Sequence, residues 1–232
     1  MTFESILILI GAFAAIVAVL FSLSKLFGEK INFTTSFIAK TAIFAAISII
    51  LYTVPFLKFG LPIFPSFLEL HFDEVPALIA GFAYGPVCGA LVILIKTIVK
   101  LPLTGTAGVG ELADLIYSVA FIIPAAVIYN KHRSIKGAIV SLCVATVIQL
   151  VVATTFTTYV MLDAYCALYG LTRGIILSMC KAANPAVNDL NFGFLFMISL
   201  PFNLIKDVAV VAITLLLYKR LHSLIDKLSF ER

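Results

Sequence analysis

Charged residues are scarce in this sequence. Asp, Glu, Lys and Arg make up 12% of its 232 residues, against about 25% in soluble domains. Apolar residues make up 62%, and the mean hydropathy is +1.15. This composition excludes a soluble globular domain. Most apolar runs extend over about 20 residues without alternating polarity, which favours membrane helices over barrel strands. The sequence therefore predicts an all-α integral membrane protein, embedded in a lipid bilayer.

Catalytic and metal-binding motifs are absent from the sequence as well. It contains no GxSxG, HExxH or Walker motif. The four cysteines, Cys88, Cys143, Cys166 and Cys180, show no CxxC or Cys/His spacing. Cys166 and Cys180 share one connection and could pair if it faces an oxidising compartment. The net charge of +4 requires no nucleic acid, because basic flanks of membrane helices account for it. We therefore expect no enzyme activity, no metal, no cofactor and no nucleic-acid partner.

Apolar runs and their Gly and Pro boundaries predict seven helical segments. These are 6–23, 37–54, 75–84, 86–100, 111–129, 137–162 and 194–218. The connection 163–192 is long enough to be functional or partly structured. Lys and Arg cluster after the first, fifth and last segments. The positive-inside rule therefore predicts a multi-pass cell-membrane protein with its N-terminus outside and its C-terminus in the cytoplasm.

Three polar side chains interrupt the last apolar run, at Asn203, Lys206 and Asp207. An ionisable group at the centre of a bilayer costs about 2.5–3.5 kcal/mol on insertion scales. Asn203 and Lys206 are three residues apart, so they share one helix face. An amide beside an ammonium group suits a neutral solute rich in heteroatoms. A polar contact between helices is the alternative, and Asp207 has no assigned role.

Other polar residues at membrane depth allow two interpretations each. Lys96 and Lys100 share a helix face and could either extend to the membrane surface or find buried partners. Asp114 lies in the first turn of its helix, where a carboxylate also favours the helix dipole. Thr157 and Thr158 belong to a hydroxyl cluster that could bind a ligand or a neighbouring helix.

Small residues line one side of the second segment. Ala42 and Ala46 are four residues apart, a spacing that permits close approach of another helix. The partner could be a helix of this chain or a separate membrane protein.

Four stretches resemble, in the same order, the substrate-binding S components of energy-coupling factor (ECF) vitamin transporters, and the riboflavin-specific S component most closely. They are 68–77 (LELHFDEVPA), 81–86 (GFAYGP), 105–114 (GTAGVGELAD) and 200–206 (LPFNLIK). The resemblance covers about residues 35–221. It implies a six-helix core with a solute pocket, residues 31–232, and leaves residues 1–30 as an additional N-terminal transmembrane helix.

The resemblance also implies how the protein works. A vitamin, riboflavin or a related heterocycle, would be captured from outside in a pocket built by the first core connection and core helices four to six. The substrate-binding residues would be Glu69, Phe72, Lys96, Asp114, Thr157, Thr158, Asn203 and Lys206. A transmembrane coupling protein would dock at Ala42 and Ala46, and two cytoplasmic ATPases would supply the energy.

The chain departs from the family pattern at three places. His71 stands where the family has Asp, Asp207 where it usually has Gly, and Thr157 or Thr158 where riboflavin members carry Asn. Two other functions remain open at this point. One is a stand-alone secondary carrier that uses Lys206 and Asp207, and the other is a membrane enzyme with Glu111 and Asp114 at an interfacial site.

Overall fold

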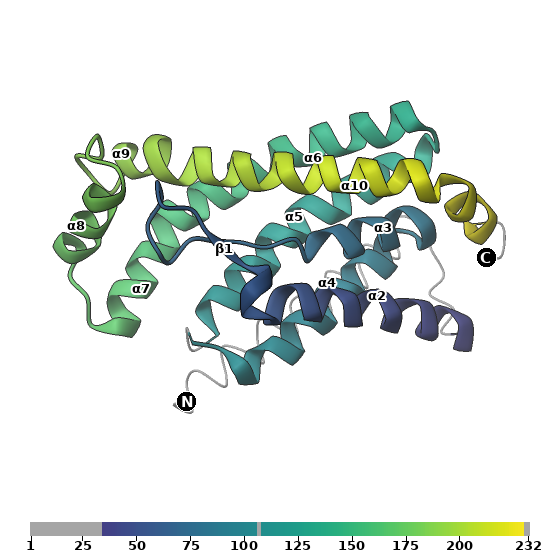
Figure 1. Ribbon diagram of the computed structural model, residues 1–232, viewed down its shortest axis with the longest axis horizontal. Coiled ribbons are helices and arrows are strands. Elements are labelled where there is room, and N and C mark those ends of the chain that lie inside the picture. Colours follow the sequence, from purple (N-terminus) through teal and green to yellow (C-terminus); the bar gives the residue numbers. More distant parts are fainter. Residues whose placement is uncertain (1–33, 106–107, 230–232) are drawn as a thin grey trace.

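The computed structural model describes residues 34–105 and 108–229, which form a helical bundle (Figure 1). The predicted helix 6–23, and with it the proposed unit 1–30, lies outside the described residues. The helices are α2 (Thr35–Thr53), α3 (Glu74–Tyr84), α4 (Pro86–Lys100), α5 (Val109–Lys131), α6 (Ile135–Phe156), α7 (Leu162–Tyr169), α8 (Arg173–Ala183), α9 (Phe192–Phe194) and α10 (Leu200–Ser229). Short 3₁₀ turns follow α2 (Pro55–Leu57) and α4 (Leu101–Leu103). The prediction of six helical segments between residues 37 and 218 is confirmed.

Local sequence explains where these helices begin and end. The Thr34 hydroxyl accepts a hydrogen bond from the Phe37 amide and caps α2, which ends before Pro55. Between α3 and α4 the chain turns at Gly85, whose φ of 98° suits glycine. Pro86 then occupies the first turn of α4, where its missing N–H costs nothing. Within the described residues, five helical stretches are long and apolar enough to cross a membrane, and α3 is shorter.

The short helix α3 lies at the centre of the bundle and packs against α2, α4, α5 and α10. Small residues allow this, since Ala77, Ala80 and Gly81 are fully buried. A Cβ atom placed on Gly89 of α4 would lie 3.1 Å from the Gly81 Cα and 2.9 Å from the Ile122 Cγ2. The two helices therefore approach more closely than larger side chains would permit.

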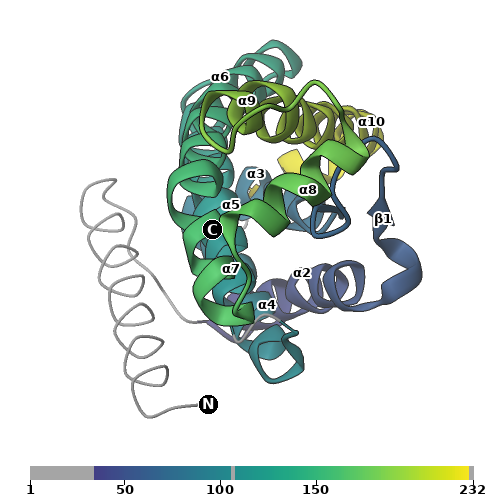
Figure 2. The same cartoon turned by 90° about the vertical axis from the view of Figure 1, so that its left-hand side faces the viewer.

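A short antiparallel hairpin and two π-helical turns lie beside the bundle core. Strands β1 (Phe59–Gly60) and β2 (Glu69–Leu70) pair in the segment that joins α2 to α3, and this segment runs between α2 and α10 (Figure 2). The π-helical turns are Thr157–Met161, which links α6 to α7, and Leu195–Ser199, which links α9 to α10. Such turns shift the helical register and often mark functional sites.

The long connection 163–192 is partly structured, as the sequence predicted. It contains most of α7 and all of α8, which cover one end of the bundle (Figures 1 and 2). Arg173 at the start of α8 donates to the Asp163 carboxylate of α7 at 2.6 Å. Cys166 and Cys180 are both free thiols.

Candidate substrate-binding site

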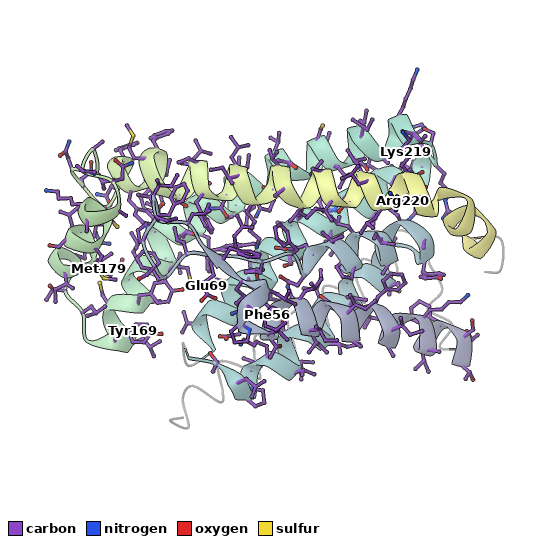
Figure 3. All side chains as sticks on the ribbon, in the orientation of Figure 1. Phe56, Glu69, Tyr169, Met179, Lys219 and Arg220 are labelled. Atoms are coloured by element: carbon purple, nitrogen blue, oxygen red, sulfur yellow. The ribbon has the colours of Figure 1, made fainter. Side chains whose placement is uncertain are left out.

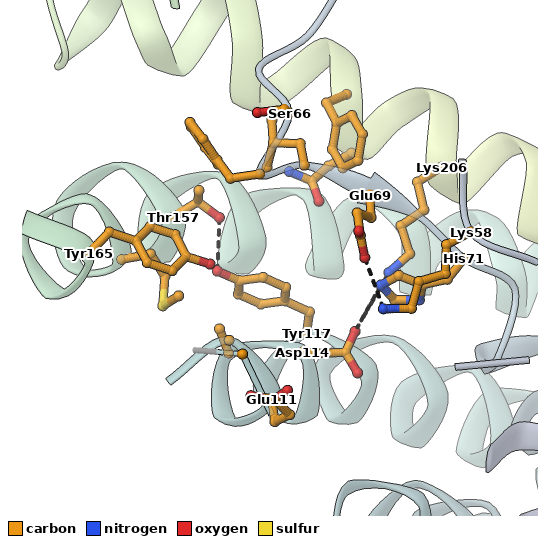
Figure 4. A pocket seen from close by; sticks show the side chains of 18 of the residues that line it. Lys58, Ser66, Glu69, His71, Glu111, Asp114, Tyr117, Thr157, Tyr165 and Lys206 are labelled. Atoms are coloured by element: carbon orange, nitrogen blue, oxygen red, sulfur yellow. Dashed lines mark hydrogen bonds and ion pairs between the residues drawn. The ribbon is translucent and has the colours of Figure 1, made fainter. Parts of the chain in front are cut away.

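A cavity of about 600 Å³ lies between the hairpin segment, α5, the α7–α8 cover and α10 (Figure 4). Its lining includes Tyr52, Lys58, Phe67, Glu69, His71, Lys100, Glu111, Asp114, Tyr117, Thr157, Tyr165, Tyr169, Met179, Phe202, Asn203 and Lys206. Figure 3 places Tyr169 and Met179 at one end of the bundle and the basic pair Lys219 and Arg220 at the other. The cavity therefore lies toward the end of the bundle opposite Lys219 and Arg220.

Buried ion pairs form the floor of the cavity. The Lys206 Nζ lies 2.6 Å from the Glu74 Oε1 and 3.7 Å from the Asp114 Oδ1. The Lys96 Nζ lies 2.8 Å from the Asp114 Oδ2 and also pairs with Asp73. All five residues are buried. These contacts offset the cost of placing two lysines at membrane depth.

The floor decides between the two interpretations of Lys96 and identifies a partner for Lys206. Lys96 does not extend to the membrane surface, because its side chain is 1% exposed and bound to two carboxylates. Lys206 finds its partner on α3, the central helix, rather than on its own helix. His71, Asp73 and Glu74 bring metal-ligand atoms within 4.8 Å of one another, but the ammonium groups already pair with both carboxylates.

His71 projects into the cavity from the end of the hairpin segment. Its Nδ1 is hydrogen-bonded to the Asp73 Oδ1, and its Nε2 lies 3.6 Å from the Asp114 Oδ1. The Tyr52 ring packs edge-on against the imidazole, with ring centroids 5.0 Å apart. Burial, reinforced by the positive charge of Lys206, lowers the pKa of His71 to about 4. The imidazole is therefore neutral at physiological pH.

Aromatic side chains form the wall of the cavity that lies away from the ion-pair floor. The Tyr117 and Thr157 hydroxyls are hydrogen-bonded at 2.8 Å, as Figure 4 shows. The Phe67 and Tyr165 ring centroids lie 5.9 Å apart. Tyr169 donates a hydrogen bond of 2.9 Å to the Gly105 carbonyl and so joins α7 to the loop before α5. Aromatic faces of this kind favour a planar, conjugated solute.

The charges on the lining balance. Lys58, Lys100 and Lys206 face Glu69, Glu111 and Asp114, while His71 is neutral. Lys58 and Glu69 form a pair at 2.8 Å in which the Glu69 side chain is 50% exposed. A cavity with no net charge suits a neutral solute with several hydrogen-bonding groups better than an ion.

The structure brings five of the predicted substrate-binding residues to the cavity wall: Glu69, Asp114, Thr157, Asn203 and Lys206. The three others lie outside the lining. Lys96 binds Asp114 from behind, and the Thr158 hydroxyl donates to the Thr154 carbonyl of its own helix. Phe72 packs against the main hydrophobic core.

The sequence analysis missed several contributors to the site, among them Glu74, His71, Tyr117 and Tyr165. One of them carried a usable signal, since Tyr117 follows Asp114 by three residues and shares its helix face. The Glu74 carboxylate precedes an apolar run and resembled an ordinary helix start. Its role depends on Lys206, which is far away in the sequence.

Ala42 and Ala46 lie on an exposed face of α2, whereas Ala45 between them is buried. They therefore do not pack against another helix of the described chain. Among the described residues nothing covers this face, which could contact lipid or a separate membrane protein.

A bundle of membrane-spanning helices that encloses a balanced, aromatic cavity defines a membrane-embedded solute-binding protein. The family model for "ECF transporter, substrate-specific component" matches residues 36–218, and the chain belongs to this family. Members are substrate-binding components of transporters, so the predicted class is confirmed and the membrane-enzyme alternative is wrong.

Relatives of known type agree with this assignment. The chain is 30% identical over 182 residues to the riboflavin transporter RibU of Staphylococcus aureus (strain TCH60), covering 78% of this chain and 89% of that protein. It is 28% identical over 194 residues to the riboflavin transporter FmnP of Bacillus subtilis (strain 168), covering 82% and 95%. A solved S component of a bacterial ECF transporter superposes with a TM-score of 0.64 at 28% identity, covering 82% of this chain and 96% of that chain.

Proposed function

We propose that this protein captures riboflavin, or a closely related planar vitamin, in the cavity between the hairpin segment, α5, the α7–α8 cover and α10. The observation that carries the proposal is the combination of an aromatic wall with a cavity lining of zero net charge, in a chain similar to two riboflavin transporters. The volume of about 600 Å³ falls within the range of about 300–1,000 Å³ for small-molecule pockets.

Five side chains contact the solute in this proposal. Asn203, Lys206 and Asp114 supply polar groups at the floor, Thr157 lies beside Tyr117, and Glu69 belongs to the hairpin segment. Lys96 acts indirectly, because it holds the Asp114 carboxylate at 2.8 Å. Phe72 and Thr158, which the sequence also suggested, support the fold rather than the solute.

The orientation follows from charge. Lys131 ends α5 and Arg133 follows it, while Lys219 and Arg220 lie in the C-terminal half of α10. Basic flanks of membrane spans favour the cytoplasm. The cavity is at the other end of the bundle (Figure 3), so it opens to the outside. The N-terminus would then also lie outside, with the C-terminus in the cytoplasm.

Energy comes from partners in this proposal, because the sequence contains no nucleotide-binding motif. A transmembrane coupling protein docks on the exposed α2 face that contains Ala42 and Ala46, and two cytoplasmic ATPases complete the transporter. The chain therefore acts as the capture subunit, and a stand-alone carrier is the competing function.

Two measurements test the proposal. Riboflavin added to the purified protein in detergent should show saturable quenching of flavin fluorescence, weakened in Asn203→Ala and unchanged in the control Thr158→Ser. Uptake by cells should require the ATPases. Absence of saturable binding would refute riboflavin capture, and uptake that persists without the ATPases would favour the stand-alone carrier.

A further inference from the structure

The hydrogen-bonding state of His71 follows from its neighbours. The Asp73 side chain pairs with the Lys96 ammonium group, and as a carboxylate it can only accept hydrogen bonds. The His71 Nδ1 beside the Asp73 Oδ1 must therefore carry a proton and donate it. Because the imidazole is neutral, the second nitrogen, Nε2, carries no proton and can only accept.

The free acceptor of His71 faces a second acceptor across the cavity floor. The Nε2 lies 3.6 Å from the Asp114 Oδ1, too far for a hydrogen bond. The Asp114 carboxylate is held in place by Lys96 at 2.8 Å. Two acceptors that face each other in a buried site repel unless a donor lies beside them. Both residues line the cavity, so the captured solute can supply that donor.

The Lys206 ammonium group lies near this acceptor pair but beyond hydrogen-bonding distance of the Asp114 Oδ1. The Lys206 Nζ is 3.7 Å from the same Asp114 Oδ1 and also lines the cavity. The floor thus presents acceptors beside a donor. An imide edge, in which an N–H group is flanked by carbonyl oxygens, has the complementary pattern. Riboflavin carries such an edge on its ring system.

We propose that His71 is a specificity-determining residue that accepts a hydrogen bond from the imide N–H of the captured solute, while Lys206 binds the adjacent carbonyl oxygen. This inference rests on the proposed function and adds to it the orientation of the solute, with its imide edge on the floor. The aromatic side chains Tyr117 and Tyr165 then flank the remaining rings. The chain selects planar imides over analogues that lack the N–H group.

Charged and aromatic groups face His71 from every side. Asp73 binds Nδ1, the Glu74 Oε2 lies 3.9 Å from the same nitrogen, and Asp114 faces Nε2. The Tyr52 ring covers the imidazole edge-on. Lys206 and Lys96 add positive charge nearby. None of the groups beside Nε2 is a donor at hydrogen-bonding distance in the described part of the chain.

The test combines one change in the solute with one change in the protein. Riboflavin and riboflavin methylated at its imide nitrogen are titrated against the wild-type protein and the His71→Asn variant. The Asn side chain can still donate to Asp73 but does not reach the position of Nε2. Methylation should weaken wild-type binding by about 10- to 100-fold, because a buried acceptor loses its donor. In His71→Asn, methylation should weaken binding by less than about 3-fold, because this variant has already lost the acceptor that the imide N–H would meet.

Two further variants serve as controls. His132→Asn makes the same substitution in the connection between α5 and α6, away from the cavity, and should retain the full methylation effect. His71→Gln places an amide oxygen near the position of Nε2 and should retain part of the methylation effect. It keeps the test valid if His71→Asn does not fold. Equal methylation effects in the wild-type protein and His71→Asn would overturn the assignment of His71 while leaving riboflavin capture intact. If wild-type protein does not bind riboflavin at all, the proposed function fails, and this inference with it.

Discussion

Replacing Lys206 with Met tests the charged floor most directly. The Lys206 side chain is 5% exposed and lies 2.6 Å from the Glu74 Oε1, which has no closer cation among the ion pairs of the described chain. Removing one partner of a buried pair costs about 3–5 kcal/mol. Asp114 keeps Lys96 at 2.8 Å, so most of this loss concerns Glu74. Lys206→Met should therefore lower the free energy of unfolding by about 3–5 kcal/mol, measured in detergent by thermal or denaturant unfolding.

Neutralising the abandoned carboxylate should reverse much of the damage. The double variant Lys206→Met with Glu74→Gln should recover at least half of the lost stability but not riboflavin affinity, which needs the ammonium group. The same substitution at Lys58, whose partner Glu69 is half exposed, should cost less than about 1 kcal/mol. Equal losses at Lys58 and Lys206, or no recovery with Glu74→Gln, would refute the account of the floor as a buried ion-pair network.

Three further predictions concern packing, protonation and coupling. Gly89→Ala should lower the unfolding temperature, because its Cβ would lie 2.9–3.1 Å from three neighbouring atoms. The control Gly174→Ala, at an exposed position of α8, should leave the unfolding temperature unchanged. Equal melting curves for the two variants would contradict this close packing. Riboflavin affinity should be constant near neutral pH and fall as the pH decreases through about 4, because protonation of His71 removes its acceptor. If His71→Gln shows the same pH dependence of riboflavin affinity, protonation of His71 is not the cause. Leu at Ala42 and Ala46 should abolish ATP-dependent uptake and leave riboflavin binding unchanged, and normal uptake would place the docking surface elsewhere.

The sequence predicted the helices well because local rules decide them. Long apolar runs have few stable alternatives in a bilayer, and Gly85 followed by Pro86 marks the break between α3 and α4. It also predicted that Asn203 and Lys206 lie on one face, since three residues span most of a helical turn. Both side chains do line the cavity.

The π-helical turn at Thr157–Met161 shows where local rules were insufficient. Nothing in the sequence separates Thr157 from Thr158, which are adjacent in one hydroxyl cluster. In the structure the first faces the cavity and Tyr117, while the second donates to the carbonyl of Thr154. Adjacent residues of a helix point about 100° apart, so the packing of this turn against α5 decides which hydroxyl faces the cavity.

The sequence by itself determined the class of protein, the membrane helices and the ionisable groups that needed an explanation. Tertiary structure alone decided how those groups pair. Glu74 meets Lys206 across α3 and α10, and Lys96 meets Asp114 across α4 and α5. The same packing places His71, whose departure from the family pattern the sequence did not explain, at the cavity floor. The physical reason is that insertion cost and helix formation depend on neighbours within a few residues, whereas ion pairs depend on which helices pack together.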